Sequence, residues 1–197
     1  MRNNFTLFIS IIVVAISCNK NINSKKSKTS NNMDSNKSFT STIKVAQSPE
    51  KAFNSIMNFR AWWSEEIEGS TDKLNETFFY HYKDVHLCKI KLIEVVPHKK
   101  LVYQVIENEF NFIKDKSEWV NTQLVFDIST EGDTTIIQFT HQGLKPEHEC
   151  YPVCQDAWTS YIQGSLHGLI TTGKGKPNAA EGGLNAELVE KWGLPKK

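Results

Sequence analysis

The sequence has almost no excess of charge of either sign. Its 197 residues include 23 Lys and Arg against 22 Asp and Glu, which gives a formal net charge of +1. Arg60 is the only arginine after the second residue. No basic stripe interleaved with aromatic residues runs through the chain, and this composition argues against nucleic acid as a partner.

A long apolar run is missing as well. The stretch from Phe5 to Ser17 is almost wholly apolar, but it is shorter than the about 20 residues that a membrane-spanning helix needs. With Arg2 before it, the stretch is typical of the apolar region of a signal peptide. Ala15 to Cys18 is similar to a bacterial lipobox, in which the cysteine is lipidated. An ordinary secretory signal cut near Ser17 is the alternative.

These features predict how the segments on either side of the folded domain are organised. We expect a lipoprotein signal peptide at 1–17, a lipidated Cys18 with a disordered linker at 18–38, and a location at the bacterial cell envelope, because the linker has almost no apolar residues to bury. The folded domain is predicted at 39–177. The tail at 178–197 is broken by Gly and Pro, with a turn or two of helix from Leu184 to Trp192.

The motifs of several enzyme classes are absent from the sequence. It has no nucleophile elbow, no P-loop and no dinucleotide-binding fingerprint. We therefore predict no catalytic residue, no cofactor and no metal. If the protein is instead an enzyme of the cyclase or hydrolase type, His81 or His141 is the candidate acid or base, because histidine titrates near neutral pH.

Cysteines are few, with three after Cys18. Cys88 lies in a predicted strand, where we expect a small buried side chain. Cys150 and Cys154 lie in the segment HECYPVC, and in an oxidising compartment they can form a disulfide. Two free thiols are the alternative. A zinc site that adds His141 and His148 is a third interpretation, although the spacing matches no known zinc-finger pattern.

What the chain does contain is alternation of apolar and polar residues. A helix is predicted from Pro49 to Asn58, followed by a short helix or turn from Asn58 to Glu66. Short connections between successive strands favour antiparallel pairing. The predicted strands are Phe39–Ala46, Thr77–Tyr82, Val85–Val96, Leu101–Glu107, Trp119–Thr130 and Thr134–His141, with a shorter one at Ile67–Thr71.

A long helix is predicted from Ala157 to Thr172. Its apolar residues fall at helical spacing on one face, beginning with Trp158 and Tyr161. Pro152 precedes the pattern and Gly173 follows it, as helix start and end signals do. An α+β fold follows, in which this helix lies on a curved antiparallel sheet of about six to seven strands, with two short helices after the first strand.

Four segments carry a resemblance to a known family. They are SPEKAFNSIMNFRAWWS, KIKLIEVVPHKKLVYQV, NTQLVFDISTEGDTTIIQFTHQGL and DAWTSYIQGSLHGLITTGKGKP. In this order and spacing, from Phe39 to Pro177, they resemble the START-like or SRPBCC superfamily, and most of all domains named after the activator of the heat-shock-protein-90 ATPase. The resemblance implies a helix-grip fold with a cavity between sheet and closing helix that binds an apolar molecule.

The same resemblance sets the functional hypotheses. We predict a membrane-tethered carrier or sensor that holds a small apolar or amphiphilic molecule. A cyclase- or hydrolase-like enzyme and a co-chaperone-like interaction module are the alternatives, since one fold serves many functions. Most of the residues predicted to contact the ligand are aromatic, and each of these also suits a plain core position. They are Trp62, Trp63, Phe78, Tyr80, Tyr103, Trp119, Phe126, Phe139, His141, Trp158, Tyr161 and Ser165.

Overall fold

A computed structural model of the chain describes residues 38–180 and 186–194. The predicted signal peptide, Cys18 and nearly all of the linker lie outside the described residues. No helix within the described part is both long enough and apolar enough to cross a membrane.

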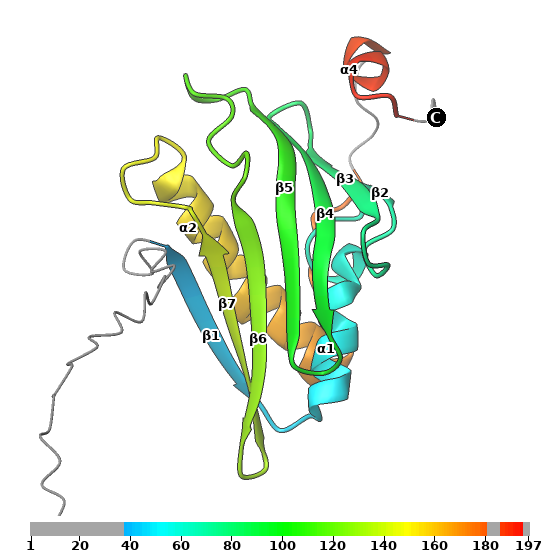
Figure 1. The fold of residues 1–197 in the computed structure, drawn as a ribbon, viewed down its shortest axis with the longest axis vertical. Helices are drawn as coiled ribbons and strands as arrows, with labels where there is room; N and C mark the ends of the chain where they lie inside the picture. Colours follow the sequence, from blue (N-terminus) through cyan, green and yellow to red (C-terminus); the bar gives the residue numbers. More distant parts are fainter. Residues whose placement is uncertain (1–37, 181–185, 195–197) are drawn as a thin grey trace, which may run out of the picture. The chain divides into compact units, whose positions relative to one another are not determined.

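The fold is α+β and is built on one curved, seven-stranded sheet (Figure 1). The strand order is β1-β7-β6-β5-β4-β3-β2, and every neighbouring pair is antiparallel. The strands are β1 (Phe39–Val45), β2 (Ile67–Gly69), β3 (Thr77–Tyr82), β4 (His86–Val96), β5 (Lys100–Phe110), β6 (Gln123–Glu131) and β7 (Thr134–Gln142). The sheet thus has the upper number of strands that the sequence predicts.

Alternation along the strands decides which face of the sheet becomes the interior. In β1 the side chains of Phe39, Ser41, Ile43 and Val45 are buried, while Thr40, Thr42 and Lys44 are exposed. Two register shifts between β4 and β5, at Lys89/Ile90 and Leu92/Glu94, interrupt the ladder. Such irregularities bend a strand pair, so they help the sheet to curve around what it covers.

The first helix, α1 (Pro49–Met57), forms as its sequence predicts. The Ser48 hydroxyl accepts a hydrogen bond of 3.2 Å from the Lys51 backbone N–H, which caps the helix start. Pro49 occupies the first turn, where its missing N–H costs nothing. Ala52, Phe53 and Ile56 are buried. A single 3-10 turn, η2 (Phe59–Ala61), then leads the chain to two buried tryptophans.

The closing helix starts earlier than the sequence pattern indicates. It comprises α2 (Tyr151–Thr159), a π-helical segment η3 (Ser160–Leu166) and α3 (His167–Thr172). Pro152 lies inside the first turn rather than before it, because that turn needs no N–H from proline. Gly173, with φ of 78°, ends the helix as predicted. Figure 1 shows this helix, coloured yellow to orange, on the same face of the sheet as α1.

The π-helical segment affects which side chains of the closing helix are buried. In a regular α-helix, residues four apart drift around the axis because a turn takes 3.6 residues. The wider turns of η3 reduce this drift. Trp158, Ile162, Leu166 and Ile170 consequently form one buried line along the helix.

Two predicted strand boundaries are shifted by three residues or more. The strand predicted from Trp119 begins only at Gln123, because Asn121 has a left-handed backbone, with φ of 67°, and the residues before it form turns. Strand β5 continues to Phe110, beyond the predicted end at Glu107. A short helix, α4 (Ala186–Lys191), lies within the predicted helical part of the tail.

Candidate functional site

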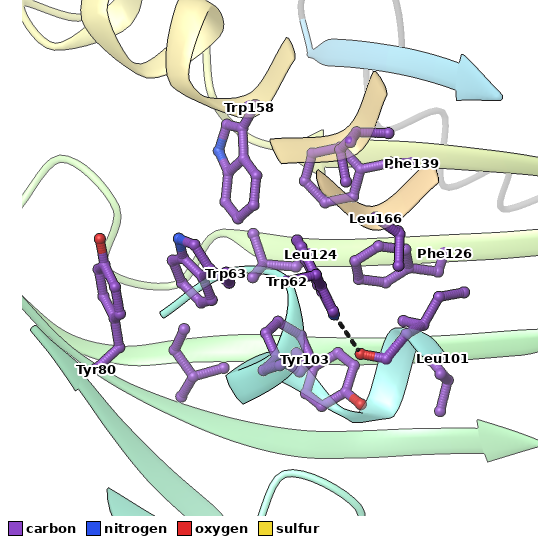
Figure 2. Close-up of a cluster of buried hydrophobic side chains, with 14 of the residues drawn as sticks. Trp62, Trp63, Tyr80, Leu101, Tyr103, Leu124, Phe126, Phe139, Trp158 and Leu166 are labelled. Atoms are coloured by element: carbon purple, nitrogen blue, oxygen red, sulfur yellow. Dashed lines mark hydrogen bonds between the residues drawn. The ribbon is translucent and has the colours of Figure 1, made fainter. Parts of the chain in front are cut away.

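Aromatic side chains fill the space between the sheet and the helices (Figure 2). Trp62 is completely buried, and its indole N–H donates to the Ile56 carbonyl oxygen at 3.0 Å, the dashed line in Figure 2. Its neighbour Trp63 stacks on Tyr80 with ring centroids 4.1 Å apart. Trp63 also contacts Trp158 of the closing helix at 5.2 Å. Two consecutive residues of one turn thus join the sheet to the helix.

His141 holds the closing helix to the sheet through a chain of hydrogen bonds. The Trp158 indole N–H donates to Nδ1 of His141 at 2.9 Å. The Thr122 hydroxyl donates to the Trp119 carbonyl oxygen at 2.6 Å, so it must accept from Nε2 of His141, which lies 2.9 Å away. Both nitrogens of a neutral His141 ring are therefore paired with protein groups. Burial lowers the pKa of His141 to about 3, which keeps the ring neutral.

Ser165 fixes the middle of the closing helix. Its hydroxyl donates to the Trp62 carbonyl oxygen at 2.6 Å and accepts from the Lys176 backbone N–H at 2.6 Å. Gly175, next to Lys176, lies so close to the Ala61 carbonyl oxygen that a Cβ atom there would overlap it. The helix is therefore packed tightly against the turn that carries Trp62.

A cavity of about 210 Å³ lies at the other end of this interface, beside Trp158. It opens to solvent between Tyr82, Phe112 and Val153, whose side chains are 39%, 41% and 59% exposed. Its walls come from the turn after η2, from β3, β4, the end of β5, the turn at Trp119 and the closing helix. They are formed by Trp63, Tyr80, Tyr82, Val85, His86, Phe110, Phe112, Trp119, Val153, Cys154, Ala157, Trp158 and Tyr161.

The predicted contact residues divide between the cavity and the closed core. Five of them line the cavity, namely Trp63, Tyr80, Trp119, Trp158 and Tyr161. The others lie in the packed interior, where the Tyr103 hydroxyl, for example, donates to the Thr71 carbonyl oxygen at 3.0 Å. These interior residues are Trp62, Phe78, Tyr103, Phe126, Phe139, His141 and Ser165.

Several wall residues were not among the predicted contacts. Cys154, Ala157 and Tyr161 follow one another at helical spacing, so an earlier helix start would have placed the first two beside the third. His86 opens strand β4 and faces the cavity between three aromatic rings. The sequence holds no comparable signal for Phe110 and Phe112, which reach the cavity only because β5 is longer than predicted.

The two cysteines at the start of the closing helix are thiols in this structure. Cys150 and Cys154 are buried one helical turn apart. A hydrogen bond that the Cys150 thiol donates to the Cys154 sulfur, together with burial, raises the pKa of Cys150 well above its usual range. No group of three or more His, Cys, Asp and Glu side chains in the described part of the chain is arranged to hold a metal ion. The predicted disulfide stays a prediction.

His81 and Arg60 are also held by protein groups. Nε2 of His81 lies 3.3 Å from the Glu66 carboxylate, and its Nδ1 lies 3.2 Å from the Lys83 carbonyl oxygen. Arg60 donates to the carbonyl oxygens of Ile67 and Gly69, at 2.9 and 2.8 Å. The guanidinium therefore braces β2 against the turn after α1, outside the cavity walls.

Comparisons with known proteins relate this arrangement to solved structures. No protein-family model matches the sequence, and no curated protein sequence matches it significantly. The solution structure of the Aha1 dimer from Colwellia psychrerythraea is similar, with a TM-score of 0.57 at 20% identity over 70% of this chain and 98% of that one. The protein SSP2350 from Staphylococcus saprophyticus gives 0.53 at 11% identity over 73% and 97%.

A third structure extends the comparison. DynU16, a putative protein in the dynemicin biosynthetic locus, gives a TM-score of 0.53 at 11% identity over 71% of this chain and 49% of that one. At these identities the likeness concerns the fold. The chain has the helix-grip fold of START-like proteins, as its sequence segments predict.

Proposed function

We propose that this protein binds one small apolar or amphiphilic molecule in the cavity beside Trp158, as a carrier or sensor at the cell envelope. The observation that carries the proposal is the cavity itself, whose walls are mostly aromatic and which opens to solvent at one end. Ligand sites are typically concave and apolar with a few polar groups. Helix-grip neighbours of similar architecture support a binding domain.

The volume limits the ligand to a small molecule. An engineered apolar cavity of about 150 Å³ holds one benzene molecule, and drug-sized ligands occupy about 300–1,000 Å³. A cavity of about 210 Å³ therefore suits one or two rings or a short branched chain. Part of a longer molecule would have to protrude through the opening between Tyr82, Phe112 and Val153.

The mouth of the cavity favours exchange of a ligand with an apolar surface. Three of the five large apolar side chains that are exposed within the described residues surround this opening. Exposed apolar side chains that cluster mark a contact site more often than scattered ones do. Under the proposal, Tyr82, Phe112 and Val153 are the first groups that an entering ligand meets.

The alternative of an enzyme acting through His141 or His81 gains no support from the geometry. Both ring nitrogens of each side chain are occupied by protein groups. A general base needs a nitrogen that can reach the substrate. Binding without chemistry is therefore the function that we propose.

A pair of matched variants tests the proposal. Ala157→Phe adds a ring to the cavity wall, whereas Thr159→Phe adds the same ring to an exposed position of the same helix. Native mass spectrometry and solvent extraction of the purified protein should detect a bound small molecule in the wild type and in Thr159→Phe, but not in Ala157→Phe. Equal occupancy in all three proteins would refute a ligand in this cavity.

The envelope anchor is a separate part of the proposal and has its own test. It rests on the similarity of Ala15 to Cys18 to a lipobox. Metabolic labelling with an alkyne fatty acid should mark the full-length chain, and Cys18→Ser should abolish the label and release the protein from the membrane fraction. An unlabelled wild-type chain would favour the ordinary secretory signal instead.

A further inference from the structure

One ring nitrogen of His86, in the cavity wall, has no hydrogen-bond partner among the described residues and stays accessible. Nε2 of His86 lies 2.9 Å from Oδ1 of Asn108. The Asn108 side chain is oriented by its own amide N–H, which donates to the Lys116 carbonyl oxygen at 2.8 Å. Because Oδ1 can only accept, Nε2 of His86 must carry the hydrogen. Nδ1 is then a bare hydrogen-bond acceptor.

The ring of His86 is fixed in this state. Burial lowers its pKa to about 3, so the imidazole is neutral at any physiological pH. Three aromatic rings hold it in place, with centroids 5.2 Å away for Tyr80, 4.4 Å for Phe110 and 4.6 Å for Trp119. Only 9% of the residue is exposed. An acceptor with a fixed direction and a fixed protonation state is therefore part of the wall.

Nδ1 of His86 differs from the other polar atoms of the wall. No described residue bonds to it, and it is not among the unpaired atoms that protein completely encloses. The indole N–H of Trp119 is completely enclosed and interacts with the Cys150 sulfur. Tyr161 accepts from the Asn178 side chain at 2.7 Å and hydrogen-bonds to the Tyr80 hydroxyl. Nδ1 of His86 is therefore an open acceptor for a donor on an entering molecule.

The wall also excludes charge. None of the thirteen described residues that form it is Asp, Glu, Lys or Arg. A buried ion without a partner is costly, so a charged ligand would lose its hydration and gain no counter-charge. The aromatic side chains instead offer flat faces and edges to a ring.

We infer that the cavity selects an uncharged, flat molecule of one or two rings that carries one hydrogen-bond donor, a hydroxyl or a ring N–H, and that Nδ1 of His86 accepts this hydrogen bond. The inference rests on the proposed function and specifies its ligand class. An apolar molecule without a donor would leave Nδ1 both unpaired and cut off from water, which is unfavourable.

Two probes that differ only in the donor test this selection. They are 2-naphthol and 2-methylnaphthalene, and their affinities are measured by equilibrium dialysis at neutral pH on the wild type and on His86→Phe. We expect His86→Phe to lower the affinity ratio of 2-naphthol to 2-methylnaphthalene by about tenfold, the effect of one net hydrogen bond. A third probe, the anion 2-naphthoate, should bind far more weakly than 2-naphthol to the wild type.

The outcomes separate the two levels of the argument. If both uncharged probes bind and the ratio is the same in His86→Phe, the role of His86 is overturned while ligand binding stands. If 2-naphthoate binds as well as 2-naphthol, the exclusion of charge is overturned. If no probe binds the wild type, the proposed function itself fails.

A second measurement needs no variant, in case His86→Phe does not fold. Long-range ¹H–¹⁵N correlation spectra of the histidine rings report which nitrogen carries the hydrogen. The free protein should show His86 with hydrogen on Nε2 only. Addition of 2-naphthol should shift the ¹⁵N signal of Nδ1, and 2-methylnaphthalene should shift it much less. Hydrogen on Nδ1 in the free protein would overturn the inference.

Discussion

Acid should destabilise this fold in a way that two buried histidines dictate. Burial holds the pKa values of His86 and His141 at about 3, whereas an unfolded histidine titrates near 6.5. Between these two values the unfolded chain binds one more proton per histidine than the folded one. The free energy of unfolding therefore falls as the pH is lowered below about 6.5, by about 1.4 kcal/mol per pH unit for each histidine.

The expected size of the effect is large enough to measure. At pH 5, about 1.5 units below the unfolded value, each histidine contributes a loss of about 2 kcal/mol relative to neutral pH, and both together about 4 kcal/mol. Urea unfolding followed by tryptophan fluorescence at pH 7.5, 6 and 5 gives the free energies directly. Staying at pH 5 or above keeps most carboxylates ionised, so they contribute little to the slope.

Variants show whether His86 and His141 cause the dependence of the free energy of unfolding on pH. His141→Gln should remove one proton from the difference between unfolded and folded chains and so halve the loss on acidification, and His86→Gln should do the same. His98→Gln, at the exposed turn between β4 and β5, is the matched control and should leave the slope as it is. A free energy of unfolding that is flat from pH 7.5 to 5, or a slope unchanged by His141→Gln, would refute the assignment of neutral buried rings.

Three substitutions and one control substitution test the packing around the closing helix, each by denaturant unfolding. Ser165→Ala leaves a carbonyl oxygen and an N–H unpaired and should cost about 1–3 kcal/mol; a change below 0.5 kcal/mol would contradict this. Gly175→Ala forces a backbone shift and should destabilise strongly, whereas Gly164→Ala, whose Cβ meets nothing within 4 Å, should not. Trp158→Phe removes the donor to His141 and should cost more than the lost ring area alone; full stability would argue against the hydrogen-bond chain.

The sequence predicts the fold because the fold follows from local patterns. The alternation of apolar and polar residues in β1 and β7 predicts which side chains are buried, even when the neighbouring strands are not known. Ser48 and Pro49 mark the start of α1, and Gly173 marks the end of the closing helix. Short connections from β3 to β5 and from β6 to β7 leave antiparallel pairing as the simple outcome. Each of these signals depends on a few neighbouring residues, so it can be recognised in the sequence without the tertiary structure.

The candidate site is harder to predict, because the position of the cavity depends on where side chains from distant segments leave a space unfilled. Trp63 and Phe126 are both buried aromatic residues at core positions, but only Trp63 borders the cavity. The difference arises from the register of distant strands and from the path of the turn before Gln123. Pro152 adds a local reason why the site is hard to predict. A prediction that places Pro152 before the helix leaves out the first helical turn, which carries Val153 and Cys154.

The polar groups of the interior show why the cavity is a better candidate site than the rest of the interface. His141 and Ser165 lie where the helix is tightly packed, and every hydrogen-bonding atom of their side chains has a protein partner. Groups satisfied in this way stabilise the fold and offer nothing to a ligand. His86 is equally buried but has one satisfied nitrogen and one open one. Because the open nitrogen stays accessible, a ligand that supplies a hydrogen-bond donor can pair with it, whereas a ligand without a donor leaves it unpaired and cut off from water.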